Sequence, residues 1–161
     1  MPIRCYIPTT LTALRSRLTD LRAVAPDEAH RGLRGEEAEA AEFDALCIAA
    51  ALAADAALEP FAAVAEVDAP DAGLGPRVVV AYDASDASPR EALTEGFDLI
   101  ALAEVDMDAV ASFHLDEEAD WDEAVSLARE SGPTAAADRL GESDLLWYDA
   151  TELDQLLSEL G

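Results

Sequence analysis

Four residues carry the side chains that could do chemistry in this chain of 161 residues: Asp83, Asp86, His114 and Asp116. Asp83 and Asp86 follow the continuous apolar run 78–80, which is typical of a strand buried on both faces. Carboxylates at the C-terminal end of such a strand often bind magnesium or take part in catalysis. Together the four residues are the set that a small metal-dependent hydrolase would need. The neighbouring Ser and Pro residues equally favour an ordinary turn, so both interpretations stay open.

His114 lies in a segment whose side chains alternate between two faces. In an extended strand Ser112 and His114 share one face, and Asp116 lies two residues further on. Such neighbours could act as nucleophile and base. The chain lacks the G-x-S-x-G turn that exposes the nucleophilic serine of many hydrolases. A hydrogen-bonded surface pair is the simpler interpretation, so we expect a protein that is not an enzyme.

Several familiar motifs are incomplete, and none predicts a cofactor or a metal. The segment 27–30 spells the D-E-A-H box of a helicase family, but that box works beside a phosphate-binding loop with a lysine, and the chain has no lysine. Alternating acids at 104–108 resemble the start of a calcium loop, yet Ala109 and Leu115 stand where Gly and Glu are required. Cys5 and Cys47 are too few for a disulfide scaffold or a zinc site. We expect no cofactor and no stoichiometric zinc or calcium.

The charge of the chain indicates what kind of partner it binds. There are 35 acidic against 10 basic residues, which gives a formal net charge of −25. Nucleic acids and anionic membranes would be repelled, so we expect neither as a partner. A basic protein partner fits this charge, and a second copy of the chain is also possible. A compositional bias of a GC-rich genome explains the same charge without any binding role, and this alternative stays open.

The basic residues are unevenly placed, and no signal peptide is expected at the N-terminus. Residues 1–34 hold six of the ten arginines. We expect Arg15, Arg17 and Arg22 to lie on a first helix and to reach carboxylates of neighbouring elements. The most apolar stretch, 45–58, has 14 residues and contains an aspartate, so it is too short to span a membrane. A cytoplasmic location is expected.

Hydrophobic periodicity predicts a single α+β domain over residues 1–161. One predicted helix follows Thr9 and has leucines at 11, 14, 18 and 21. Another begins at Ser88, which has a capping-box spacing. Thr151 is expected to cap the last helix. The segments 25–35 and 68–76 are predicted loops. One mixed sheet of four or five strands should be covered by helices mainly on one face, with one long central helix. The predicted strands are 3–7, 77–82, 97–103, 109–115 and 145–148, and the other predicted helices are 36–58, 121–131 and 134–140.

The two ends of the chain share one pattern, Y-x-x-T-x-L-x-x-L-x-S-x-L, which begins at Tyr6 and again at Tyr148. Each copy describes a short strand followed by a capped helix with leucines toward the core. The two ends are expected to play equivalent structural roles, either as a pseudo-symmetric pair or by convergence on good capping. Trp147 and Tyr148 are either a core tryptophan with a tyrosine at the rim or an aromatic patch that anchors a partner, since Trp and Tyr are enriched at interface hot spots. The interface candidates are Tyr6, Trp147 and Tyr148.

Three segments together resemble a small actinobacterial family known only as a domain of unknown function. They are the start C-Y-I-P-T-T-L at 5–11, the centre V-A-S-F-H-L-D at 110–116 and the end D-L-L-W-Y at 144–148. The resemblance covers essentially the full chain. It implies an actinobacterial cytoplasmic protein, and it carries no activity or catalytic residue.

The sequence therefore favours a non-enzymatic acidic interaction module that binds a basic protein partner or a second copy of itself. The alternative is a small metal-dependent hydrolase built on the four residues named first. The two hypotheses differ in space, because the hydrolase requires those side chains to converge in one pocket.

Overall fold

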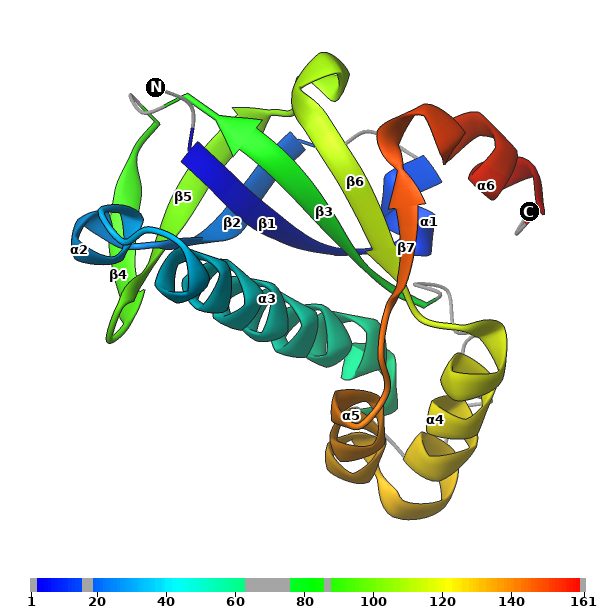
Figure 1. The fold of residues 1–161 in the computed structure, drawn as a ribbon. Helices are drawn as coiled ribbons and strands as arrows, with labels where there is room; N and C mark the ends of the chain where they lie inside the picture. The colour runs from blue at the N-terminus through cyan, green and yellow to red at the C-terminus, as the bar shows by residue number, and fades with distance from the viewer. Residues whose placement is uncertain (1–2, 16–18, 63–75, 86–87, 160–161) are drawn as a thin grey trace.

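The structure of the chain, a computed structural model, describes residues 3–15, 19–62, 76–85 and 88–159. Within these residues one sheet of seven strands has the order β4-β5-β2-β1-β3-β6-β7, and every neighbouring pair is antiparallel (Figure 1). The predicted α+β class is confirmed, and the predicted mixed sheet of four or five strands is wrong. The strands are β1 (Ile3–Thr10), β2 (Thr19–Pro26), β3 (Arg77–Ala84), β4 (Arg90–Thr94), β5 (Phe97–Glu104), β6 (Val110–Leu115) and β7 (Leu146–Asp149). The helices are α1 (Leu11–Arg15), α2 (Glu28–Arg31), α3 (Glu36–Ala62), α4 (Glu118–Ser131), α5 (Pro133–Gly141) and α6 (Leu153–Glu159), with the 3-10 turns η1 (Met107–Ala109) and η2 (Ala150–Glu152).

The strands β2 and β4 lie where the sequence predicted helix. The leucine spacing predicted a helix through Leu21, but α1 ends at Arg15 and β2 has begun by Thr19. In β2, Ala23 enters one core and Val24 the other, which is the pattern of a strand buried on both faces. β4 pairs with β5 across a turn at Gly96, whose φ of 89° suits a glycine in a tight hairpin.

The long helix α3 crosses one face of the sheet and contacts β1, β2 and β3 (Figure 1). Ala45, Ala49 and Ala53 are fully buried at a spacing of four residues, so they form one stripe along the helix. Their small side chains allow the helix to approach Tyr6 and neighbouring strand residues closely. The predicted central helix is confirmed, and it extends past Pro60 to Ala62.

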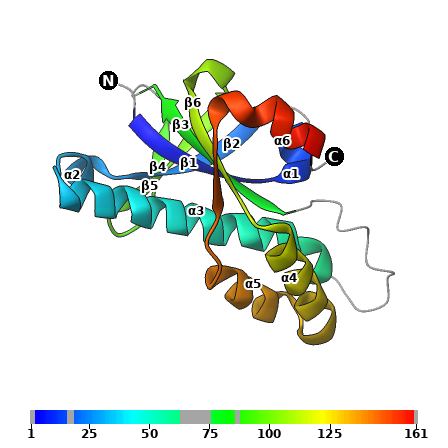
Figure 2. The same cartoon turned by 45° about the vertical axis from the view of Figure 1, so that its right-hand side comes forward.

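The opposite face of the sheet packs against α1 and α6, so helices cover both faces rather than mainly one (Figure 2). Leu11 of α1 and Leu153 of α6 contact the same core. The two matching end segments thus place leucines in one shared core. The predicted cap at Thr151 is wrong, because Asp149 accepts a hydrogen bond from the Thr151 backbone and forms a capping box with Glu152.

The predicted role of the N-terminal arginines changes because their helix is short. Arg22 lies on β2, and its guanidinium forms an exposed ion pair with Glu91 of β4. Arg17 and the side chain of Arg15 lie outside the described residues.

The helices α4 and α5 form a hairpin that packs against the C-terminal part of α3. Gly132, with a φ of 95°, links the two helices. Trp121 of α4 and Leu140 of α5 are buried between this hairpin and Leu58 of α3. Both helices are slightly longer than predicted. The hairpin extends away from the sheet, and the chain returns from α5 to β7 along the side of α3 (Figure 1).

Candidate functional site

A pocket of about 560 Å³ lies between α3, α5 and the segment that connects α5 to β7. This volume is in the range of cavities that hold small ligands or a few side chains of a partner. The walls are mainly apolar, and their largest apolar side chains are Phe43, Leu46, Leu140 and Leu145. The other lining residues are Cys47, Ala50, Ala51, Ala54, Asp55, Arg77, His114, Ala137, Asp138, Gly141, Ser143 and Asp144.

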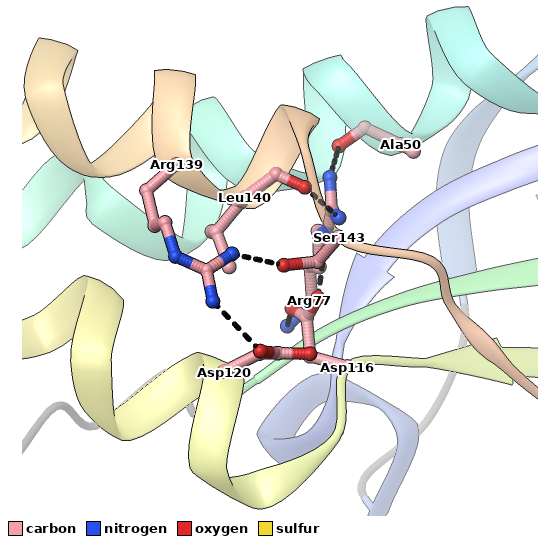
Figure 3. A network of polar contacts seen from close by, with 7 residues as sticks. All are labelled: Ala50, Arg77, Asp116, Asp120, Arg139, Leu140 and Ser143. Carbon is pink, nitrogen blue, oxygen red and sulfur yellow. Dashed lines mark hydrogen bonds and ion pairs between the residues drawn. The ribbon is translucent and has the colours of Figure 1, made fainter.

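Arg77, the first residue of β3, is among the lining residues of this pocket, and it forms hydrogen bonds to three other segments of the chain (Figure 3). Its Nε donates to Asp116 Oδ1 at 2.9 Å, and its backbone amide donates to the other carboxylate oxygen at 3.3 Å. Its Nη1 and Nη2 donate to the carbonyl oxygens of Ala50 on α3, at 3.3 Å, and Leu140 on α5, at 2.6 Å. Burial raises the pKa of the Asp116 carboxyl, and the Arg77 charge acts in the opposite direction. Arg77 therefore offers the pocket no uncompensated positive charge.

A second arginine fixes the wall that α5 contributes. Arg139 donates from Nη2 to Asp120 and to Glu123 of α4, each at 2.9 Å. Its Nη1 donates to the Ser143 hydroxyl, at 2.5 Å, in the segment that follows α5 (Figure 3). The hairpin and the connecting segment are thus tied together beside the pocket.

The free charge of the pocket is negative. Asp55, Asp138 and Asp144 are exposed at its rim, and none of them forms an ion pair in the part of the chain that the structure describes. Burial lowers the pKa of His114 from its ordinary value, so its ring is neutral at pH 7. An apolar cavity with three carboxylates at its rim favours a ligand that combines an apolar group with positive charge.

Ser112 and His114 form the hydrogen-bonded pair that alternation along the strand predicted. His114 Nε2 lies 3.0 Å from the Ser112 hydroxyl oxygen, and both side chains face α3. Ser112 is buried, and it is not among the residues that line the pocket. In the described chain no carboxylate is bonded to the His114 ring. The pair therefore lacks both the access and the orienting group that a nucleophilic serine needs.

The four residues of the hydrolase hypothesis do not share one pocket where they are described. Asp83 pairs with Arg4, whose Nε lies 2.7 Å from Oδ1, near the C-terminal end of β3. Asp116 is bonded to Arg77 at the opposite end of β3. Arg77 precedes Asp83 by six residues, so the two positions lie roughly 20 Å apart along the strand. Asp86 lies outside the described residues. Among the described residues no group of three His, Cys, Asp or Glu side chains could hold a metal ion.

The three interface candidates differ in exposure. Tyr6 is buried beneath α3, and this burial raises its pKa to about 12. Tyr148 is half-buried against the core on the opposite face. Trp147 is 61% exposed on β7 and pairs in register with His114.

Phe43 is 62% exposed and lines the pocket. Phe43 was not among the predicted interface residues, although an aromatic residue between Glu42 and Asp44 on an acidic helix was a signal that could have found it.

These features define an acidic α+β protein with a seven-stranded antiparallel sheet in its described part and a pocket beside its long helix. The chain belongs to a family of unknown function, DUF6912, whose family profile matches residues 3–157. This match confirms the resemblance to a domain of unknown function over essentially the full chain, and the actinobacterial origin stays a prediction. Comparison with curated proteins gave no match, and comparison with solved structures gave none either. Across the described helices, none is long and apolar enough to cross a membrane.

Proposed function

We propose that this chain is a non-enzymatic interaction module that binds a basic protein partner through the pocket beside α3. The partner inserts an apolar side chain between Phe43 and Leu145, and arginine or lysine residues on either side of it meet the rim carboxylates. The observation that carries this proposal is the combination of apolar walls with a rim whose unpaired charges are all negative.

The other polar groups of the pocket support binding rather than catalysis. Arg77 and Asp116 compensate each other, and Ser112 lies behind the lining. Among the described lining residues, the charged groups left for a ligand are carboxylates. The net charge of −25 would also steer a basic partner toward the molecule and speed its association. Two copies of the chain repel each other through the same charge, so a basic partner is favoured over a second copy.

Binding of defined peptides tests the proposal. The probe is a fluorescent peptide with one central leucine flanked on both sides by arginines. We expect it to bind with an affinity that falls as salt is added, because exposed charges are screened within about 10 Å at 0.1 M salt. A peptide with glutamates in place of the arginines, and one with glycine in place of the leucine, should bind at least tenfold more weakly.

Two sets of variants locate the site. The triple variant Asp55→Asn, Asp138→Asn and Asp144→Asn removes the rim charges, and Ala51→Trp fills the pocket from an exposed position. Both should weaken binding of the arginine peptide. The matched control neutralises three exposed acids outside the lining: Glu95, Asp122 and Glu130. Equal loss of binding in the two triple variants would show that overall charge, and not the pocket, binds the peptide. No binding of any arginine peptide would overturn the proposed function.

A further inference from the structure

The sheet has two edges, and they differ in how they are protected. At one edge, β4 carries Arg90 and Glu91, and its pairing with β5 contains a register shift before Thr94. Charges and bulges of this kind discourage an additional strand from pairing. At the other edge, β7 pairs only with β6 within the described chain, and its ladder is regular over all its residues. Three of the four residues of β7 favour strand structure or are apolar, namely Leu146, Trp147 and Tyr148.

Two large apolar side chains are exposed on this open edge. Leu146 is 41% and Trp147 is 61% exposed. Successive residues of a strand point to opposite faces, so each face of the sheet presents one of them at its border. Trp147 shares a face with His114, toward the pocket, whereas Leu146 shares a face with Leu115, toward the core next to α1. A strand added along β7 would meet an apolar neighbour on either side.

Carboxylates flank this apolar stretch at both ends. Asp144 precedes β7 and is exposed without an ion pair in the described residues, and Asp149 ends the strand as the cap of η2. A second copy of the chain paired along β7 would bring these carboxylates toward like charges, which is destabilising. A strand with cations at its ends and apolar residues between them is complementary to this edge.

We propose that the open edge of β7 accepts an additional strand from a basic protein partner, with Trp147 as the side-chain anchor and Asp144 and Asp149 as the charged ends. This inference rests on the proposed function and names the conformation of the bound segment, which is extended. Backbone hydrogen bonds to β7 provide part of the affinity, as in other cases of strand addition. The added strand lies beside the pocket, and it does not need to enter it.

A peptide with a matched backbone control tests this proposal. The probe is a heptapeptide with arginine at both ends and alternating valine and threonine between them. Its control carries N-methyl groups on alternate amides, which removes hydrogen-bond donors while the side chains remain. We expect the control to bind about tenfold more weakly, because two or so backbone bonds are lost. Hydrogen exchange at residues 146–149 should slow when the unmethylated peptide binds.

Two variants separate this inference from the proposed function. Trp147→Thr keeps the strand preference and removes the anchor, and we expect about thirtyfold weaker binding of the heptapeptide. The double variant Asp55→Asn and Asp138→Asn, which keeps Asp144, should affect the leucine peptide more than the heptapeptide. Equal binding of both heptapeptides, or no protection at 146–149, would overturn strand addition while binding in the pocket could still hold. Protection at 146–149 without peptide, together with concentration-dependent dimers, would also overturn it, because the occupant would then be a second copy.

Discussion

Arg77 and Asp116 form an ion pair whose side chains are only 3% and 0% exposed, with Nε 2.9 Å from Oδ1. The pair joins the start of β3 to the segment after β6, and the same guanidinium reaches carbonyl oxygens on α3 and α5. Buried charges are costly unless they are paired and hydrogen-bonded, and here each polar side-chain atom in the described interior has a partner. The pair therefore determines how the helical wall of the pocket is placed against the sheet.

Replacement of Arg77 should destabilise the fold strongly. Arg77→Met leaves the Asp116 carboxylate buried without a cation, so we expect the free energy of unfolding to fall by about 3–5 kcal/mol. Arg4→Met breaks the half-exposed pair with Asp83 and should cost about 0–1 kcal/mol. Urea melts of both variants measure the difference. If the two variants lose equal stability, the buried pair does not have the structural role assigned to it.

A double variant tests the reason for that loss. Arg77→Met combined with Asp116→Leu removes both charges, so no unpaired charge stays buried. We expect it to be more stable than Arg77→Met alone, because breaking one side of a buried pair costs more than replacing both. The comparison uses the same urea melts. A double variant less stable than either single variant would mean that packing, and not the unpaired charge, causes the loss.

Salt should stabilise this protein. With a net charge of −25 on a compact chain, repulsion between carboxylates opposes folding. Added salt screens this repulsion, and the screening length falls to about 8 Å at 0.15 M. We therefore expect the Tm to rise between low salt and several hundred millimolar sodium chloride. Differential scanning calorimetry measures it, and a flat or falling Tm contradicts the prediction.

Local sequence patterns correctly predicted the elements whose secondary structure is determined by their own residues. The apolar run of β3, the end of α4 at Ser131 and the alanine-rich α3 were all found from the sequence. The strands β2 and β4 were missed because their local signals favour helix, and strand pairing overrides these signals, with the distant β5 for β2 and across the Gly96 hairpin for β4. Leu21 illustrates the conflict, since it fits a helical leucine stripe and also the alternation of β2.

The candidate site was harder to predict, because its residues come from four separate segments of the chain. His114 was found through alternation within one strand. Arg77 gave no signal, because a charged residue beside an apolar run usually marks the exposed end of a strand, and only the fold brings Asp116 to it. Asp138 and Asp144 look like ordinary surface acids until α5 folds back against α3.

The two cysteines should differ in reactivity. Cys5 is buried, which raises its pKa to about 12, whereas Cys47 is exposed and lines the pocket. We expect iodoacetamide to label only Cys47 in the folded protein. Partial burial also raises the Cys47 pKa, so labelling at pH 8 should be slower than for a free thiol and should accelerate with pH. Mass spectrometry of labelled wild type and of Cys47→Ser measures both effects.

Binding in the pocket should protect this thiol. The leucine peptide flanked by arginines covers Cys47 if it inserts as proposed, so labelling should slow as the peptide saturates. The glutamate peptide serves as the control and should leave the rate unchanged. Labelling of Cys5 in the folded wild type, or an unchanged rate at saturating arginine peptide, would contradict these expectations.

His114 should make the stability depend on pH in one direction. Its desolvated ring has a pKa below the ordinary value in the folded chain, whereas in the unfolded chain it titrates near 6.5. As the pH falls below about 7, the unfolded chain takes up this proton first, so the free energy of unfolding decreases until the folded pKa is reached. His114→Gln can keep a hydrogen bond to Ser112 and cannot titrate. We expect urea melts between about pH 7 and pH 5 to show a steeper loss of stability in wild type than in the variant, since the carboxylates that titrate are the same in both. Parallel curves would show that the proton on His114 does not distinguish the folded from the unfolded chain.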